Sequence, residues 1–203
     1  MSPRPRSDRV TAAILAATLD VVARTGYERL TIEGIAAEAR VAKTTIYRWW
    51  PSKEAVLLDA FMDHQERCGG TRLPNTGDLA ADLRTLLTST IEGLIDPRFD
   101  APYRALTAAM QHDTALAADI LQRLLNPLLA LTRERLVEAR RLGQVDPSVD
   151  LDLAVELLYG PVFHRWLLGT RPLSPQDGTR LADLVLRVIA PLGEYAQQVG
   201  TTV

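Results

Sequence analysis

The sequence predicts an all-α protein in two parts, a three-helix N-terminal domain over residues 1–52 and a larger helical domain over residues 53–203. Apolar residues recur every three or four positions along most of the chain, which is the helical period. The composition, 47% hydrophobic but only 5% aromatic, is typical of Ala- and Leu-rich packing between helices. No segment has the pattern of a strand, and no repeat or low-complexity tract is present.

The first helix is expected to begin at Ser7 or Asp8 and to run to Arg24 or Thr25. Gly26 is expected to end it in a left-handed turn. Its apolar side, which should pack on the next two helices, carries Val10, Ile14, Ala17 and Val21.

Two short helices follow, joined by the three residues Arg40 to Ala42. In the first, Thr31 is the expected N-cap, Glu33 lies in the positive first turn, and one face carries Ile32, Ile35, Ala36 and Ala39. The second is the stretch from Val41 to Lys53, which Pro51 stops. Two short helices with such a turn are typical of a helix-turn-helix, whose second helix enters the major groove of DNA.

The second helix has two different sides at about 100° of rotation per residue. Ile46 and Trp50 fall on one side and are expected to anchor the helix in the core. Trp49 is turned aside, where its indole N–H can reach a phosphate. The opposite side is free to contact a ligand and carries Thr44, Tyr47 and Arg48. We therefore interpret this stretch as a DNA-reading helix.

A series of short motifs lies in order between Val10 and Ala60. They are Ile14-Leu15, Gly26-Tyr27, Thr31-Ile32, Ile35-Ala36, Val41, Thr45-Ile46-Tyr47 and Pro51-Ser52-Lys53-Glu54-Ala55. In this order they resemble the DNA-binding domain of the TetR family of bacterial transcriptional regulators. Arg40, Ala42 and Trp49 depart from the family pattern, which usually has glycine, serine and often histidine there. The missing glycine and the missing serine cap would cost about 1 kcal/mol each.

The resemblance implies contacts with double-stranded operator DNA. Lys43, Thr44, Tyr47 and Arg48 are expected at the groove or at phosphates, and Thr31 and Lys53 are expected to hold phosphates at two helix N-termini. The full set of candidate contacts is Thr31, Arg40, Lys43, Thr44, Thr45, Tyr47, Arg48, Trp49 and Lys53. Arg4 and Arg6 form either a frayed terminus or an arm that reaches the minor groove.

The charge distribution agrees with a DNA partner. Residues 1–53 carry nine Lys/Arg and five Asp/Glu, a net charge of +4, whereas residues 54–203 carry −6. The basic end of the chain is therefore expected to face the polyanion, although the sequence pI is about 5.9.

Other classes of protein fit poorly. The histidines His64, His112 and His164 are scattered, no catalytic or phosphate-binding motif accompanies them, and we expect no enzyme activity, cofactor or metal. The single Cys68 cannot form an intramolecular disulfide, which fits a reducing cytoplasm. Asp8 and Asp20 bracket the first apolar run, which argues against a signal peptide, and no apolar run is long enough to span a membrane.

The larger domain is expected to begin with a helix capped by Ser52, followed by a breaker-rich loop over residues 69–77. Further helices are expected from Asp78 to the break at Asp96-Pro97, near 102–111, over 114–142 with a bend at Asn126-Pro127, and over 150–170 and 176–198.

The last two of these helices are unusually apolar. They carry Leu151, Val155, Leu158, Tyr159, Val162, Phe163, Trp166 and Leu167 on one and Leu181, Leu184, Val185, Val188, Ile189 and Leu192 on the other. Part of this surface would stay exposed unless two chains pair. The resemblance implies a four-helix homodimer interface at these positions, and a dimer suits a palindromic operator with two half-sites.

The resemblance also implies a small-molecule pocket between the helices of the larger domain. Its candidate residues are Tyr103, Gln111, His112, Tyr159, Phe163, His164 and Trp166. Two functions stay open: a repressor that a small-molecule effector releases from DNA, and a DNA-binding dimer without an effector. An effect of a ligand on DNA affinity would separate them, and turnover of a substrate would indicate the more remote possibility of an all-helical enzyme.

Overall fold

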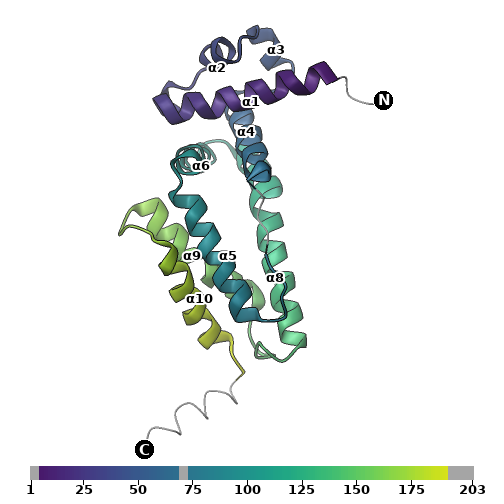
Figure 1. Cartoon of the computed structure of the whole chain (residues 1–203), viewed down its shortest axis with the longest axis vertical. Helices are drawn as coiled ribbons and strands as arrows, with labels where there is room; N and C mark the ends of the chain where they lie inside the picture. The colour runs from purple at the N-terminus through teal and green to yellow at the C-terminus, as the bar shows by residue number, and fades with distance from the viewer. Residues whose placement is uncertain (1–4, 69–72, 192–203) are drawn as a thin grey trace, which may run out of the picture. The chain divides into compact units, whose positions relative to one another are not determined.

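The computed structural model describes residues 5–68 and 73–191, and within these residues it contains helices and no strand (Figure 1). The all-α prediction is therefore confirmed. By their internal contacts, residues 1–71 and 96–125 form one compact unit, and residues 72–95 and 126–203 form a second. Within the described ranges, no helix is both long and apolar enough to cross a membrane.

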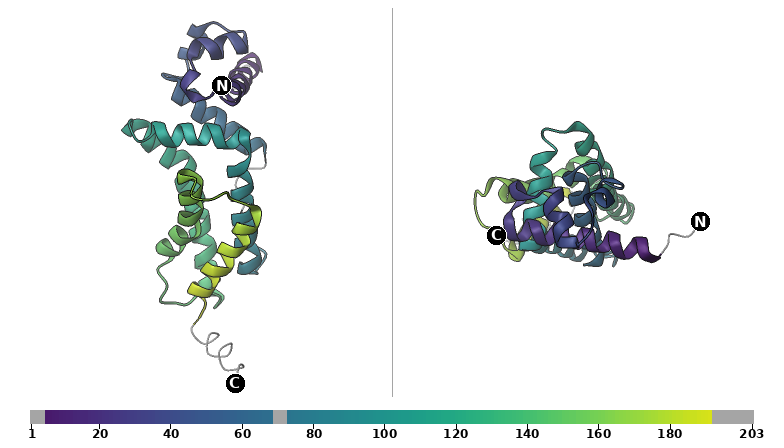
Figure 2. Two further views of the ribbon diagram at one scale, coloured as in Figure 1. Left: turned by 90° about the vertical axis from the view of Figure 1, so that its left-hand side faces the viewer. Right: turned by 90° about the horizontal axis from the view of Figure 1, so that it is seen from above.

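The first unit contains the predicted helix-turn-helix. Its elements are α1 (Pro5–Thr25), a 3-10 turn (Tyr27–Arg29), α2 (Ile32–Ala39), α3 (Lys43–Tyr47), α4 (Lys53–Arg67), α6 (Pro97–Ala109), α7 (Thr114–Ile120) and a π-helical turn (Leu121–Leu125). α1 packs against both α2 and α4 (Figure 2). The fully buried side chains that hold these helices together include Ile14, Leu30, Ile35, Ile46, Leu57, Phe61 and Leu106.

Two helix starts and the conformation of one glycine differ from the prediction. α1 begins at Pro5, before the expected caps Ser7 and Asp8. α6 begins at Pro97 because the Asp96 carboxylate accepts the Arg98 N–H at 2.9 Å and proline is well suited to the first position of a helix. Gly26 does have a positive φ of 78°, but its ψ of 163° puts it in a region that glycine alone adopts readily, rather than in the left-handed helical region.

The second unit contains α5 (Leu79–Ile95), α8 (Asn126–Arg141), α9 (Leu151–Leu168) and α10 (Pro175–Ile189). α10 lies along α5, and the two backbones come close at Gly178, where a Cβ would stand 2.6 Å from the backbone nitrogen of Thr88. A buried ion pair joins Arg135 of α8 to Asp82 of α5 at 2.8 Å. The expected break at Asp96-Pro97 ends α5 as predicted.

The predicted helix over 114–142 is present as α7, the π-helical turn and α8 in direct succession. The irregularity precedes Pro127, near the expected bend. Of the other expectations, the loop residues 69–72, the arm residue Arg4, the side chain of Arg6, and Leu192 with the end of the last helix lie outside the described residues.

The two compact units do not coincide with the predicted domains 1–52 and 53–203, because α4, α6 and α7 group with the helix-turn-helix. The predicted domains separate DNA binding from ligand binding and dimerisation. That functional division stays a prediction.

Candidate nucleic-acid interface

The turn between α2 and α3 holds a side chain in an unfavourable backbone conformation. The N–H of Arg40 donates to the Ala37 carbonyl at 3.3 Å, and the N–H of Val41 donates to the Ala36 carbonyl at 3.0 Å, as in a Schellman motif. Arg40 has φ 56° and ψ 45°, which is the left-handed region that favours glycine. A side chain there costs about 1 kcal/mol of stability.

α3 is shorter than the predicted helix from Val41 to Lys53. Ala42 precedes it without a side-chain cap, and the N–H groups of Trp49 and Trp50 both donate to the Ile46 carbonyl, which closes the helix before Pro51. Ile46 is fully buried, and Trp50 is buried with its Nε1 donating to Asp59 Oδ2 at 2.7 Å. The predicted anchoring side of this helix is therefore confirmed.

The opposite side of α3 faces solvent. Lys43, Thr44, Tyr47, Arg48 and Trp49 are all exposed, and Thr45 is half-buried. Tyr47 is 55% and Trp49 is 60% exposed, and the Arg48 guanidinium lies 5.8 Å from the Trp49 ring. Two large aromatic rings next to cations form a surface suited to stacking, hydrogen bonding and charge pairing with a polyanion.

Lys43 is held by an acidic residue of the preceding helix. Its ammonium lies 2.8 Å from a carboxylate oxygen of Glu33, and both groups are exposed. This hydrogen bond raises the pKa of Lys43 and lowers that of Glu33. A phosphate that binds Lys43 must share it with Glu33 or displace that carboxylate.

The N-terminus of α4 presents a second cation. Ser52 caps the helix by accepting the Ala55 N–H at 3.2 Å, and the Lys53 ammonium lies 4.4 Å from the centre of the Tyr27 ring. The Tyr27 hydroxyl donates to Glu54 at 2.7 Å. Burial and this bond raise the pKa of Tyr27. Burial alone would raise the pKa of Glu54, but the bonds from Tyr27, from its own backbone amide and from Ser52 lower it.

Lys53 is therefore positioned by an aromatic ring from a separate segment, a contact that sequence reasoning misses because nothing local links Tyr27 to Lys53. At the start of α2, Thr31 already accepts the Gly34 N–H at 3.0 Å. Its hydroxyl proton stays available for a phosphate oxygen.

The candidate ligand residues do not come together as one set. In the first unit, Tyr103 is buried and stacks on Phe61 at 5.3 Å between ring centres, and burial raises its pKa. Gln111 and His112 are exposed beyond the end of α6.

The remaining candidates belong to the second unit. Tyr159 is buried, its hydroxyl lies 2.8 Å from that of Thr132, and burial raises its pKa to about 12. Phe163 packs edge-on against the buried Trp166 at 5.9 Å, and His164 is exposed. Their place in a ligand pocket stays a prediction.

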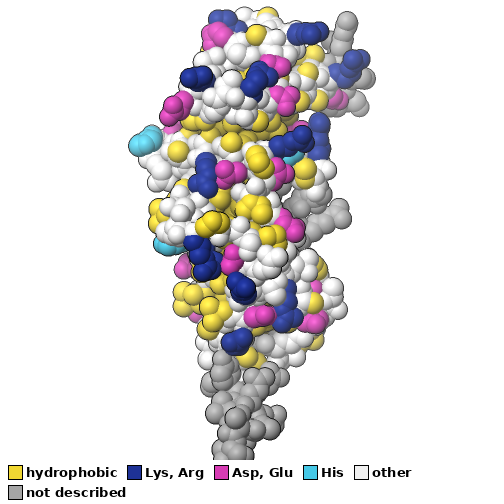
Figure 3. Space-filling model, turned by 60° about the vertical axis from the view of Figure 1, so that its left-hand side comes forward, with side chains coloured by type: hydrophobic (Ala, Val, Ile, Leu, Met, Phe, Trp, Pro, Cys, Tyr) yellow, Lys and Arg dark blue, Asp and Glu magenta, His cyan; other side chains and the backbone are white. Residues whose placement is uncertain are grey.

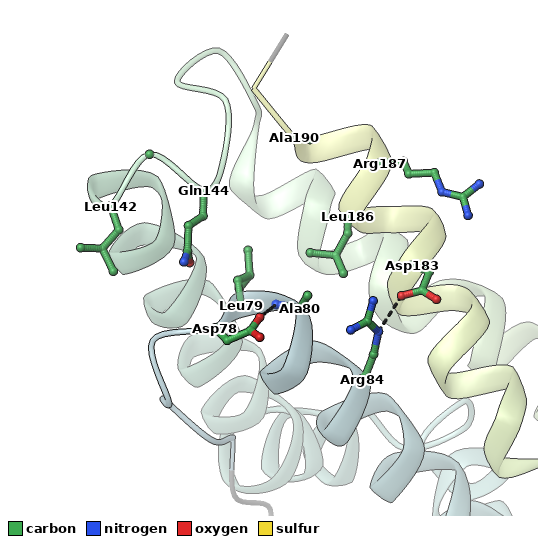
Figure 4. Close-up of a pocket in the computed structure, with 11 residues that line it drawn as sticks. Asp78, Leu79, Ala80, Arg84, Leu142, Gln144, Asp183, Leu186, Arg187 and Ala190 are labelled. Carbon is green, nitrogen blue, oxygen red and sulfur yellow. Dashed lines mark hydrogen bonds and ion pairs between the residues drawn. The ribbon is translucent and has the colours of Figure 1, made fainter. Parts of the chain in front are cut away.

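A groove of about 970 Å³ opens in the second unit between the ends of α5, α8 and α10 (Figure 4). None of the candidate ligand residues lines it. Arg84 and Asp183 pair across it at 2.7 Å, and Asp78 caps α5 by accepting the Ala80 N–H, so these charged groups already have protein partners. In the described parts of the chain, no group of three His, Cys, Asp or Glu residues is arranged to hold a metal ion.

Comparison with known proteins identifies the family of this chain. Residues 14–60 match the family described as "Bacterial regulatory proteins, tetR family", and residues 73–185 match the family described as "Tetracyclin repressor-like, C-terminal domain". The chain belongs to the TetR family. The resemblance predicted from its motifs is thus confirmed, and the protein is a DNA-binding transcriptional regulator from a family that is not enzymatic.

Individual TetR-family proteins are similar over nearly the whole chain. The DNA-binding transcriptional repressor TetR of Mycobacteroides abscessus is 33% identical over 91% of this chain and 95% of its own. The crystal structure of the TetR family transcription regulator SCO0332 is 35% identical, with a TM-score of 0.72 over 90% of this chain and 99% of its own. RolR, in a crystal structure with its ligand resorcinol, shares the fold, with 18% identity and a TM-score of 0.64 over 98% of this chain and 96% of its own.

Proposed function

We propose that the protein is a cytoplasmic transcriptional repressor that binds a palindromic operator as a homodimer and leaves it when a small-molecule effector binds. The observation that carries the DNA-reading part is the two-sided α3. Ile46 and Trp50 fix its inner side in the core, while Tyr47, Arg48 and their neighbours stand in solvent. A rigid helix with a free polar and aromatic side suits the major groove.

In this proposal the contacts divide by chemistry. Thr44 and Arg48 read base edges, since an arginine side chain can donate two hydrogen bonds to guanine. Lys43, Thr45 and Tyr47 contact the groove wall or its phosphates. Thr31 and Lys53 hold phosphates at the N-termini of α2 and α4, and Arg40 and Trp49 add phosphate contacts from the edge of the motif.

The dimer is proposed from apolar side chains that the second unit leaves in solvent. Figure 3 shows hydrophobic side chains exposed among charged ones on one face of the molecule. On α9 and α10 the exposed ones are Leu153, Leu157, Leu167, Leu168, Leu184 and Val188. Gly160 of α9 is also exposed, and among the described residues outside its own helix backbone and chain neighbours, no atom would come within 4 Å of a Cβ there. Such a surface favours a second copy of the chain.

Many of the apolar residues named for these two helices are buried in their own chain and are not available to a partner: Leu151, Val155, Leu158, Tyr159, Val162, Trp166, Val185 and Ile189. Val162 is buried in its own chain, with 2% exposure, whereas Val188 is 60% exposed. Any test of the dimer therefore has to use the outward-facing residues.

Control by an effector has indirect support. The chain contains the family's C-terminal domain, and RolR, which has the same fold, binds resorcinol. An effector can release DNA only if it binds better to a conformation in which the two reading helices are wrongly spaced. The alternative, a DNA-binding dimer without an effector, predicts no change of DNA affinity with any ligand.

The experiment has two stages. Duplexes that the full chain retains from a random pool are sequenced, and a two-fold symmetric consensus is expected. A compound library is then screened for release of that duplex. A compound that releases the duplex lowers the affinity of the chain for DNA by some factor, expected to be about 5- to 150-fold. Calorimetry with and without the duplex should then give ligand affinities that differ by that same factor. Absence of any consensus would contradict DNA reading, and equal ligand affinities would contradict effector control.

A further inference from the structure

A line of polar contacts connects the end of the reading helix to a residue far along the chain. Trp50, just after α3, donates its indole N–H to Asp59 Oδ2 of α4 at 2.7 Å. The other oxygen of the same carboxylate, Oδ1, accepts from Arg123 Nη2 at 2.6 Å. Arg123 also reaches Asp119 at 3.2 Å, one turn earlier in its own segment. All four residues belong to the first unit.

The backbone around Arg123 explains how its side chain reaches Asp59. Residues 121–125 form a π-helical turn, a rare conformation that occurs mostly as single turns and often at functional positions. In a regular α-helix the residue at 127 would donate its N–H to the carbonyl of Arg123, but Pro127 has no N–H to donate. The wider turn lies directly before this missing donor, and Arg123 is part of it.

The carboxylate of Asp59 is therefore shared between two partners with different roles. Trp50 is 6% exposed and fixes the end of the segment that carries Tyr47, Arg48 and Trp49. Arg123 supplies the positive charge, and its hydrogen bond with Asp59 raises the pKa of the guanidinium. Trp50 and Arg123 hold the two oxygens of the half-buried Asp59 carboxylate, so the two ends of this contact line constrain each other.

We propose that Asp59 and Arg123 are positioning residues for DNA reading, and that they act by fixing Trp50 and thereby the orientation of α3. This inference rests on the proposed DNA-reading role of α3. Neither residue needs to contact DNA. Arg123 lies in the π-helical turn, and this turn continues directly into α8. The contacts from Arg123 through Asp59 to Trp50 therefore link the turn to the end of the reading helix.

The size of the effect follows from exposure. The Arg123 and Asp59 side chains are 38% and 31% exposed, so their pairing is partly screened by water. Loss of the pair should therefore weaken specific binding by several-fold without abolishing it. Because Asp59→Asn keeps an acceptor for Trp50 but removes the charge, it should match Arg123→Gln, and the double variant should be no worse than either single one.

The test compares two DNA probes, the duplex selected by the wild-type chain and an unrelated duplex of equal length, each titrated at several salt concentrations. Arg123→Gln, Asp59→Asn and Trp50→Phe should lower affinity for the selected duplex about 3- to 10-fold more than for the unrelated one, with an unchanged salt slope. Arg123→Lys should restore most of the loss. The matched control is Arg67→Gln, which removes a cation that pairs with Asp63 at 3.0 Å. Both residues lie on α4, as Asp59 does, and this variant should show no selective loss of affinity for the selected duplex.

Three results would overturn the inference. Equal losses on both duplexes would mean a general loss of folded protein. A salt slope lowered by about one per protomer would make Arg123 a direct phosphate contact. A selective loss no larger than that of Arg67→Gln would mean that the contact line is irrelevant to reading. In each case the wild-type chain still selects DNA, whereas a wild-type chain that selects none would overturn the proposed function and this inference with it.

Discussion

Two surfaces of this protein leave large apolar side chains in water, and they differ in what surrounds those side chains. On α3 and directly after it, Tyr47 and Trp49 are interleaved with Lys43 and Arg48, and the acidic Glu33 is already paired with Lys43. On α9 and α10, leucine and valine side chains are exposed in a row along each helix. Exposure alone therefore does not identify a partner. The neighbouring cations support the proposed polyanion in the first case, and the exposed leucine and valine side chains support the proposed second copy of the chain in the other.

The largest effect is expected from the apolar surface. Leu157→Glu combined with Val188→Glu places charges in the proposed interface and should convert a dimer into a monomer. A monomer would lose the linked second half-site, so affinity for a palindromic duplex should fall about 100-fold. Sedimentation and DNA titration measure the two consequences.

The control for that experiment is Val137→Glu on α8. Val137 and Leu157 are both 40% exposed, but Val137 lies outside the proposed interface. This variant should remain a dimer with full affinity. If the wild-type chain sediments as a monomer and still binds the palindrome with full affinity, the proposal that two paired chains read the two half-sites is wrong.

A second prediction concerns the packing of α10 on α5, because this packing sets which side chains of α10 face outward. Gly178→Ala would put a Cβ 2.6 Å from the Thr88 backbone nitrogen and 2.8 Å from the Leu87 carbonyl carbon. Backbone cannot yield as a side chain can, so the free energy of unfolding should fall by about 1–3 kcal/mol. Gly93→Ala on α5, where nothing lies within 4 Å, is the control and should leave stability unchanged or slightly raised. Chemical denaturation measures both variants, and equal stabilities would show that the close contact is relaxed in solution.

A third prediction concerns DNA binding by the charged surface, at Lys53 and its neighbour Tyr27. Lys53→Ala should weaken binding to all duplexes about five- to tenfold and lower the salt slope by about one per bound protomer, because one phosphate contact is lost. Tyr27→Leu, which removes the ring beneath the Lys53 ammonium, should give a smaller loss in the same direction. Titrations over a salt series decide this, and an unchanged slope for Lys53→Ala would remove Lys53 from the interface.

The smallest effect is expected at the turn before α3, and it should have two opposite parts. Arg40→Gly relieves a left-handed side chain and should stabilise the fold by about 1 kcal/mol, or about 2–4 °C in melting temperature. The same change removes a proposed phosphate contact and should reduce DNA affinity a few-fold. Calorimetric melting and DNA titration test the two parts separately. A melting temperature that falls would contradict the strain, and an unchanged affinity would contradict the contact.

The success of sequence reasoning differed between the same two regions. For the reading helix, a single buried side at helical spacing was enough to predict that Ile46 and Trp50 face inward. For α9 this failed at Val162, because both sides of the helix are apolar and periodicity alone does not show which side faces inward. α6 began earlier than expected because Asp96-Pro97 is both a break after one helix and a good start for the next.

Other features had no sequence signal at all. Asp59 and Arg123 are 64 positions apart, and nothing near either residue indicates that they meet. The π-helical turn could be suspected only as a bend near Pro127. Long-range pairing and local backbone irregularity depend on the packed chain, so they became visible only in the structure.

The central claim, that the exposed side of α3 reads base sequence, is tested most directly by comparing the duplexes selected from one random pool by the wild-type chain, by Arg48→Ala and by Lys53→Ala. A side chain that reads bases should change the consensus when it is removed, whereas a phosphate contact should not. We predict that Arg48→Ala relaxes the consensus at one position in each half-site, and that Lys53→Ala selects the wild-type consensus with lower affinity. An Arg48→Ala consensus identical to that of the wild-type chain would contradict the assignment of Arg48 as a base-reading residue of α3.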